Sequence, residues 1–131
     1  MKIIFIRHGE AEIYAEDDFE RKLTIQGKRK LEAIFEEFAE DLEDKESYKI
    51  YSSPLRRAKE TAEILSRYLE KDYEVKNYLA GGRIEDILKE LDRNNNYIFV
   101  SHEPFLSNWI YQLTGELKIV SRGSIHPVEV K

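Results

Sequence analysis

The sequence predicts an α/β fold, a three-layer α/β/α sandwich with a mostly parallel central sheet. Two short apolar runs, residues 1–6 and 97–100, are rich in β-branched and aromatic side chains without polar alternation. Such runs are typical of strands that are buried on both faces. Segments with helical spacing of apolar residues lie between the strand candidates, so strand and helix alternate along the chain. This alternation indicates parallel strands that are joined by crossover helices.

Length and composition indicate a single domain over residues 1–131. The chain is 41% hydrophobic and 36% charged, and it contains no apolar stretch long enough for a secretory signal or a transmembrane helix. A net charge of −5 argues against general binding to nucleic acid or to an anionic membrane. The absence of cysteine excludes disulfides and thiolate metal sites and fits a cytoplasmic protein.

The first part of the chain predicts a strand, a helix and a second strand. Residues 1–6 form the first strand, and an acidic, irregular stretch follows at residues 11–22. Thr24 is the expected N-cap of a helix whose apolar side chains recur at helical spacing, with charged residues on the opposite face. After a polar loop, residues 48–51 predict a short second strand.

The middle of the chain continues the alternation. Ser53 as N-cap and Pro54 as the first helical residue predict the start of the next helix. A short strand is expected at residues 73–75. The pair Gly81-Gly82 then interrupts the chain before another amphipathic helix, and residues 97–100 form the fourth strand.

The last part predicts a helix and an edge hairpin. Pro104 is expected to start the helix and Gly115 to end it. Residues 117–120 and 124–130 have the composition of two strands around the turn Arg122-Gly123. We therefore expect a hairpin at one edge of the sheet.

Arginine and histidine side chains follow three of the predicted strands. Arg7 and His8 come directly after the first strand, Arg57 lies shortly after the second, and His102 follows the fourth. Because the carboxyl ends of parallel strands lie at one edge of the sheet, we expect these four side chains to converge. Two helix N-termini at the same edge add partial positive charge. Such a cluster requires an anion, and the planar fork of arginine fits a dianionic phosphoryl group best.

Four segments contain these residues in a wider pattern. They are Arg7-His8-Gly9-Glu10; Arg21-Lys22-Leu23-Thr24-Ile25-Gln26-Gly27; Ser52-Ser53-Pro54-Leu55-Arg56-Arg57-Ala58-Lys59-Glu60-Thr61-Ala62; and Val100-Ser101-His102-Glu103-Pro104. In order and in placement on the elements, they resemble the histidine phosphatase superfamily, and most closely its short phosphohistidine phosphatase branch. The resemblance spans most of the chain and implies the phosphoglycerate mutase-like form of the α/β/α fold.

The resemblance also implies a role for the four clustered residues. His8 is the expected nucleophile that accepts the phosphoryl group, Arg7 and Arg57 bind its oxygens, and His102 stabilises the charge on the transferring group. Neighbouring arginines disfavour protonation of His8, which leaves its attacking nitrogen free at neutral pH.

Of the two adjacent arginines, Arg57 precedes the alanine as the family's phosphate-binding arginine does, and this leaves Arg56 as a solvated neighbour.

Two further residues, Arg21 and Gly9, are expected to border the substrate. Arg21 lies in a pattern typical of the short branch, Asp18-x-x-Arg21, where it is expected to border the pocket and to pair with Asp18. Gly9 is expected to contribute to substrate binding.

The chain departs from the larger family members in one respect. Those members place a carboxylate general acid shortly after the third strand, but residues 77–82 contain none, and the next acids are Glu85 and Asp86. A phosphoramidate nitrogen leaves more easily than an alkoxide, so the missing acid favours phosphohistidine as the substrate. The insertions that cap the pocket of mutases are also missing, which leaves an open site for a protein surface.

These observations predict a metal-independent phosphatase that forms a phosphohistidine intermediate on His8 and needs no cofactor. Its expected partner is a phosphorylated protein or a small phosphorylated metabolite, and neither nucleic acid nor a membrane. Two alternatives remain open: a general small-molecule phosphomonoesterase, and a phosphate- or phosphoprotein-binding module with weak turnover. Ser52 and Ser53 are expected to be helix caps rather than nucleophiles, and His126 an ordinary strand residue.

Overall fold

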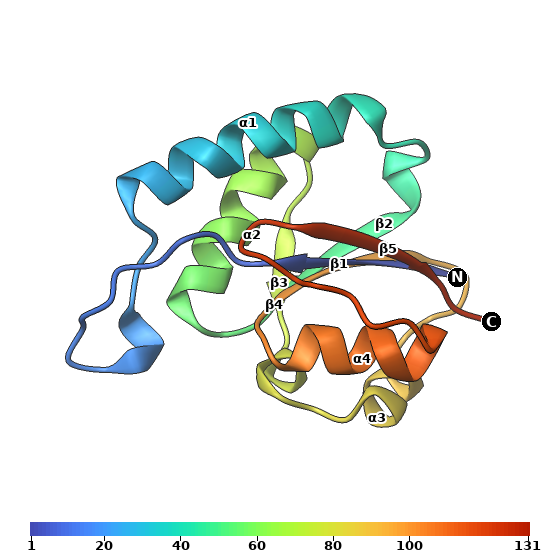
Figure 1. Cartoon of the computed structure of the whole chain (residues 1–131). Helices are drawn as coiled ribbons and strands as arrows, with labels where there is room; N and C mark the ends of the chain where they lie inside the picture. The colour runs from blue at the N-terminus through green and yellow to red at the C-terminus, as the bar shows by residue number, and fades with distance from the viewer.

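The computed structural model describes residues 1–131, and a five-stranded sheet with the strand order β3-β2-β4-β1-β5 forms its centre (Figure 1). The strands are β1 (Lys2–Arg7), β2 (Tyr48–Ser52), β3 (Tyr73–Val75), β4 (Asn96–Ser101) and β5 (Ile125–Glu129). The first four run parallel, and β5 pairs antiparallel with β1. The carboxyl ends of β1, β2 and β4 therefore meet at one edge, as the sequence predicts.

Helices cover both faces of the sheet, which confirms the three-layer α/β/α fold (Figure 1). One face carries α1 (Ile25–Asp41) and α2 (Arg56–Leu69), and the other carries α3 (Ile84–Lys89) and α4 (Phe105–Thr114). Three short 3-10 turns complete the chain: η1 (Asp18–Glu20), η2 (Lys45–Ser47) and η3 (Asn77–Ala80). None of the helices has the length and apolar character needed to cross a membrane.

The apolar run in β1 serves both layers at once. Ile4 and Ile6 pack in the half of the core that contains α1 and α2, whereas Ile3 and Phe5 pack in the half that contains α4. Successive side chains of a strand point to opposite faces, so a strand in the middle of such a sheet must be apolar at every position. This requirement explains why the run does not alternate.

Most predicted element ends agree with the structure, and the hydrogen bonds give the reason. The hydroxyl of Thr24 accepts a hydrogen bond from the backbone N–H of Gly27 at 2.8 Å, which confirms Thr24 as the N-cap of α1. Gly115 ends α4 with a φ of 75°, a left-handed conformation that glycine adopts without strain.

Two predicted helix starts are wrong by one or two residues. Helix α2 begins at Arg56 with Leu55 as its N-cap, not with Ser53 and Pro54. The hydroxyl of Ser53 is instead engaged by the ring of His102 across the sheet edge. Helix α4 begins at Phe105, directly after Pro104.

The predicted C-terminal hairpin is also wrong. Residues 117–120 form no strand, and only β5 joins the sheet. The side chains of Leu117 and Ile119 are 88% and 92% exposed, so these apolar residues pack against nothing. The Val120 carbonyl accepts a hydrogen bond from Arg7 at 2.9 Å instead of pairing with a strand. This hydrogen bond attaches the segment to Arg7 at the carboxyl end of β1.

Candidate active site

Backbone hydrogen bonds hold the three strand ends together at the sheet edge. The N–H of His8, just past β1, donates to the carbonyl of Ser101 at 3.1 Å. The N–H of Ser53, just past β2, donates to the carbonyl of Val100 at 3.0 Å. The residues that follow β1, β2 and β4 are thus fixed relative to one another, and the side chains of His8, Arg57 and His102 reach one small region from distant parts of the chain.

The ring of His8 is oriented by the next residue. Its Nδ1 lies 2.7 Å from the carbonyl oxygen of Gly9, and because a carbonyl can only accept, Nδ1 carries the proton and donates. The Nε2 atom of the neutral ring therefore keeps its lone pair. The N–H of Gly9 donates to the hydroxyl of Thr61 at 3.2 Å, and this hydroxyl donates to the carbonyl of Arg57 at 2.7 Å. Both backbone groups of Gly9 are thus engaged within the protein, and its contact with a substrate stays a prediction.

Gly9 also has a steric reason to be glycine. A Cβ atom at this position would lie 2.7 Å from the Cδ1 atom of Leu31, a buried residue of α1. A larger residue would therefore force the buried Leu31 side chain, or the backbone beside His8, to move.

The surroundings keep His8 uncharged. Burial lowers the pKa of His8 to about 4, and the positive charges of Arg57 and Arg7 add to this effect. The side chain is only 7% exposed. At neutral pH His8 is thus an imidazole with a bare Nε2 atom, the form that can act as a nucleophile.

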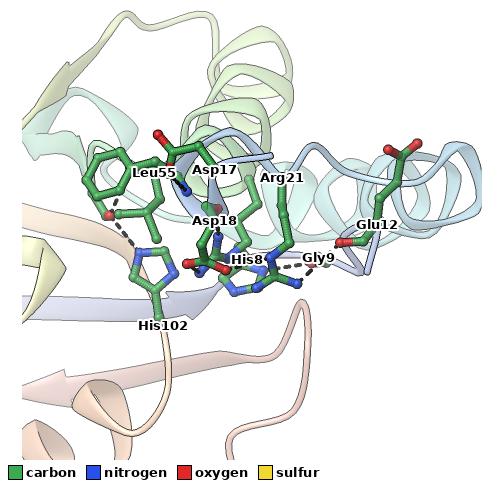
Figure 2. Close-up of polar contacts among 11 residues, drawn as sticks. His8, Gly9, Glu12, Asp17, Asp18, Arg21, Leu55 and His102 are labelled. Carbon is green, nitrogen blue, oxygen red and sulfur yellow. Dashed lines mark hydrogen bonds and ion pairs between the residues drawn. The ribbon is translucent and has the colours of Figure 1, made fainter. Parts of the chain in front are cut away.

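His102 lies beside His8, with the two ring centroids 5.0 Å apart (Figure 2). Its Nε2 atom is 2.6 Å from the hydroxyl oxygen of Ser53, and its Nδ1 atom is buried without a hydrogen-bond partner. Burial lowers the pKa of His102 to about 3, helped by the charge that His8 acquires when it is protonated and by the charge of Arg57. His102 is neutral at pH 7. Its Nε2 atom is engaged in the hydrogen bond with Ser53, and its Nδ1 atom has no partner.

Each of the two arginines has one partner at its far end and a free Nε. Arg7 donates from Nη1 to the carbonyl of Val120, and Arg57 donates from Nη1 to the carbonyl of Asp18, each at 2.9 Å. The Nε atoms of both are buried and have no partner. Of four such buried side-chain atoms in the chain, three belong to Arg7, Arg57 and His102. Buried polar atoms rarely stay unpaired, so their concentration at one place indicates a site for an anion.

An acidic turn lies over this site. The carboxylate of Asp18 in η1 accepts a hydrogen bond from Nε of Arg21 at 2.8 Å, and its other oxygen is 3.5 Å from Nη2 of Arg57 (Figure 2). The predicted pairing of Arg21 with Asp18 is therefore present. The hydrogen bond from Arg21 is the main cause that lowers the pKa of the Asp18 carboxyl. Asp18 is ionised at neutral pH and unsuited to donate a proton.

The structure places no general acid where the larger family members have one. Glu85 is on the surface of α3 and pairs with Arg83 at 3.4 Å, and η3 contributes no acid. Arg56 pairs with Glu60 at 3.1 Å along α2, as expected for a solvated neighbour of Arg57. No group of three or more histidine, aspartate or glutamate side chains is placed to hold a metal ion.

Two hydroxyls of the site were not anticipated from the sequence. Ser53 was expected to be a helix cap and Thr61 was given no role, but Ser53 hydrogen-bonds directly to His102, and Thr61 hydrogen-bonds to Gly9, which orients His8. Ser53 directly follows β2 just as His8 directly follows β1, so its position in the sequence could have indicated that it lies at the same edge of the sheet. Its partner lies 49 residues away, and no local pattern reveals such a contact.

Comparison with known proteins gives one family and a consistent set of folds. The family model of the histidine phosphatase superfamily (branch 1) matches residues 3–81. The protein histidine phosphatase SixA, solved with tungstate, is 23% identical with a TM-score of 0.85, and the match covers 98% of this chain and 88% of that chain. A putative phosphohistidine phosphatase SixA from Agrobacterium tumefaciens is 19% identical with a TM-score of 0.82, covering 98% of this chain and 90% of that chain.

A relative with a different kind of substrate shares the fold as well. Mycobacterial glucosyl-3-phosphoglycerate phosphatase is 12% identical with a TM-score of 0.71, and the match covers 98% of this chain and 89% of that chain. The search of curated proteins found no match. At these identities the solved structures establish the phosphoglycerate mutase-like fold and leave the substrate open.

Proposed function

Because the chain belongs to the histidine phosphatase superfamily and is a phosphatase, we propose that it hydrolyses phosphohistidine on a protein through an intermediate on its own His8. The observation that carries the proposal is the set of three buried, unpartnered atoms on Arg7, Arg57 and His102, residues that lie near His8, whose own Nε2 atom is bare. A phosphoryl group offers oxygens to all three and its phosphorus to Nε2.

The reaction proceeds in two displacements. In the first, the lone pair of Nε2 of His8 forms a bond to phosphorus while the P–N bond of the substrate breaks. The electron pair of that bond goes to the leaving imidazole nitrogen, which takes up a proton from water. In the second, a water molecule attacks phosphorus and gives a proton to the hydroxide left by the first step, and the bond to Nε2 breaks. Inorganic phosphate leaves, and the lone pair returns to His8.

The cationic groups supply the electrostatic stabilisation. Arg7 and Arg57 are held by the carbonyls of Val120 and Asp18, so their forks are positioned before the substrate arrives. Fixed charges of this kind need no reorganisation as the phosphoryl charge is redistributed, and this is the main source of catalysis in phosphoryl transfer. His102 completes the set, with its ring beside that of His8.

The substrate class is proposed from the missing proton donor. Neither the ionised Asp18 nor Glu85 on the surface can protonate a poor alkoxide leaving group at neutral pH. An imidazole nitrogen leaves without such help, which favours a phosphoramidate. One observation favours small-molecule phosphomonoesters instead: His8 is only 7% exposed and lies under the Asp18 turn, so a protein-borne phosphoryl group must reach past this turn. The cytoplasmic location predicted from the composition stays a prediction.

Trapping of the intermediate tests the nucleophile. The protein is mixed with a reactive phosphomonoester and quenched in alkali, where phosphohistidine survives, and the added phosphoryl mass is mapped. We expect the label on His8, its loss in His8→Ala, and retained phosphate binding in that variant. His126→Ala is the matched control, because His126 lies on β5 and its ring hydrogen-bonds to Ser124 rather than to a residue of the candidate site. A protein with neither label nor turnover would be a binding module.

A comparison of rates tests the substrate class. The value of kcat/KM is measured for a protein that carries phosphohistidine and for an alkyl phosphomonoester. We expect the phosphoramidate to react at least about 10-fold faster, which corresponds to about 1.4 kcal/mol of additional transition-state stabilisation. Much faster hydrolysis of the alkyl ester would establish the small-molecule alternative.

A further inference from the structure

We propose that Ser53 is a positioning residue that holds the proton of His102 on Nδ1, so that His102 presents an N–H donor to the phosphoryl group. This inference rests on the proposed function for its catalytic meaning. Its structural content, the tautomer of His102, can be measured without any turnover.

The contact between the two residues is short and shielded from water. The hydroxyl oxygen of Ser53 lies 2.6 Å from Nε2 of His102, and the two residues are 0% and 5% exposed. Ser53 belongs to the segment after β2, and His102 follows β4, so the contact joins the ends of two neighbouring strands. Water does not compete for either group at this position.

The directions of the hydrogen bonds follow from counting protons. The oxygen of Ser53 already accepts a hydrogen bond from the N–H of Leu55 at 3.3 Å. If Nε2 of His102 carried the ring proton, it would donate to the same oxygen, and the Ser53 hydroxyl proton would have no acceptor. If Nε2 is bare, the hydroxyl donates to it, and all three groups are satisfied. The second arrangement is therefore favoured, and it places the proton of the neutral ring on Nδ1.

The Nδ1 atom is the part of His102 that faces the site. It is buried and has no partner within the protein. In Figure 2 one ring nitrogen of His102 is bonded to a hydroxyl, and the other is turned towards Asp18 and His8. A proton on Nδ1 makes this atom a donor for a phosphoryl oxygen. A bare Nδ1 would point a lone pair at that oxygen and repel it.

The two histidines then differ in function although they are the same tautomer. His8 donates from Nδ1 to the carbonyl of Gly9 and presents a bare Nε2 to phosphorus. His102 accepts at Nε2 from the hydroxyl of Ser53 and presents its Nδ1–H. The Gly9 carbonyl makes His8 a nucleophile, and the Ser53 hydroxyl makes His102 a hydrogen-bond donor. A neighbour that fixes a catalytic tautomer in this way has large effects on rate in other enzymes.

The tautomer is tested directly by NMR. In protein labelled with ¹⁵N-histidine, long-range ¹H–¹⁵N correlations distinguish a protonated from a bare ring nitrogen. We expect a protonated Nδ1 and a bare Nε2 for His102 in the wild type at pH 7. In Ser53→Ala we expect the Nε2–H form to appear, because the hydroxyl that selects against it is gone. Ser53→Thr retains a hydroxyl and should restore the wild-type pattern.

Kinetics of the same variants test the consequence. We expect Ser53→Ala to lower kcat by about 10- to 100-fold with little change in KM, since both arginines remain. Ser53→Thr should recover most of the rate. Ser52→Ala is the matched control: it removes a neighbouring buried hydroxyl that bonds only to the Ser53 carbonyl, and it should leave the His102 tautomer unchanged.

Two results would overturn the inference. One is a wild-type spectrum with the His102 proton on Nε2, which remains decisive even if Ser53→Ala does not fold. The other is a folded Ser53→Ala protein that keeps both the wild-type tautomer and the wild-type kcat. Failure of the proposed function is seen separately, as an absence of label on His8 in the wild type.

Discussion

At the scale of single residues, the charge state of His8 decides what the site can do. A histidine with an ordinary pKa near 6.5 would be protonated in a fraction of the molecules at neutral pH, and that fraction would have no free lone pair for nucleophilic attack. Burial and the nearby Arg57 and Arg7 prevent this by lowering the pKa to about 4. The bare Nε2 atom is therefore available over the whole neutral range and is lost only as the pH falls through the lowered pKa.

Titration of His8 by NMR checks this charge state. We expect its ring shifts to titrate with a midpoint near pH 4. In Arg57→Gln the midpoint should move upward, because one of the charges that disfavour protonation is removed. The neighbouring variant Arg56→Gln should leave the midpoint unchanged. A wild-type midpoint at or above 6.5 would mean that His8 is not held neutral by its surroundings.

At the scale of elements, Thr24 connects the start of α1 to the segment that follows β1. Its hydroxyl accepts from the N–H of Gly27 and donates to the carboxylate of Glu10, each at 2.8 Å. The N–H of Thr24 also donates to the carbonyl of Glu10 at 3.0 Å. A helix cap thus also anchors the loop that begins with His8.

Replacement of this cap has a defined effect. Thr24→Ala should lower the free energy of unfolding by about 1 kcal/mol or somewhat more, since both hydrogen bonds of the hydroxyl are lost. Thr24→Ser keeps the hydroxyl and should retain most of the stability. Urea unfolding of the three proteins measures the difference. Equal midpoints for Thr24→Ala and the wild type would show that the cap contributes nothing.

The elements could be predicted where the pattern is local and not where a distant partner intervenes. The all-apolar runs of β1 and β4 and the cap at Thr24 depend on neighbours in the sequence, and they were predicted well. The start of α2 was not, because the Ser53 hydroxyl hydrogen-bonds to His102, which follows β4. The tail failed for a related reason: residues 117–120 have strand composition, but the Val120 carbonyl accepts a hydrogen bond from Arg7, a partner far away in the sequence.

At the scale of the whole molecule, the site exists only in the folded protein. Arg7 and His8, Arg57, and His102 come from three separate parts of the chain and are brought together by the sheet. Their convergence could be predicted from the parallel topology and the family motifs. The hydrogen bonds that leave one atom of Arg7, Arg57 and His102 free could not, because they depend on side-chain packing.

An anion that binds this site should therefore stabilise the entire fold. Inorganic phosphate at about 100 times its Kd should raise the free energy of unfolding by about 2.7 kcal/mol, compared with chloride at equal ionic strength. Arg57→Gln should lose most of this effect, and Arg56→Gln should retain it. Thermal unfolding in the two salts provides the measurement. Equal stabilisation of both variants would place the anion elsewhere.

The position of β1 has a consequence for biosynthesis. This strand is synthesised before both of its partners, since Ile3 pairs with Tyr97 on one side and with Val128 on the other. The apolar residues of β1 therefore stay unpaired until β4 and β5 have left the ribosome. Such long-range pairing slows folding and leaves β1 exposed to chaperones or to aggregation in the meantime. Because the site combines His8 after β1 with His102 after β4, it can assemble only once β4 has been synthesised and has paired with β1.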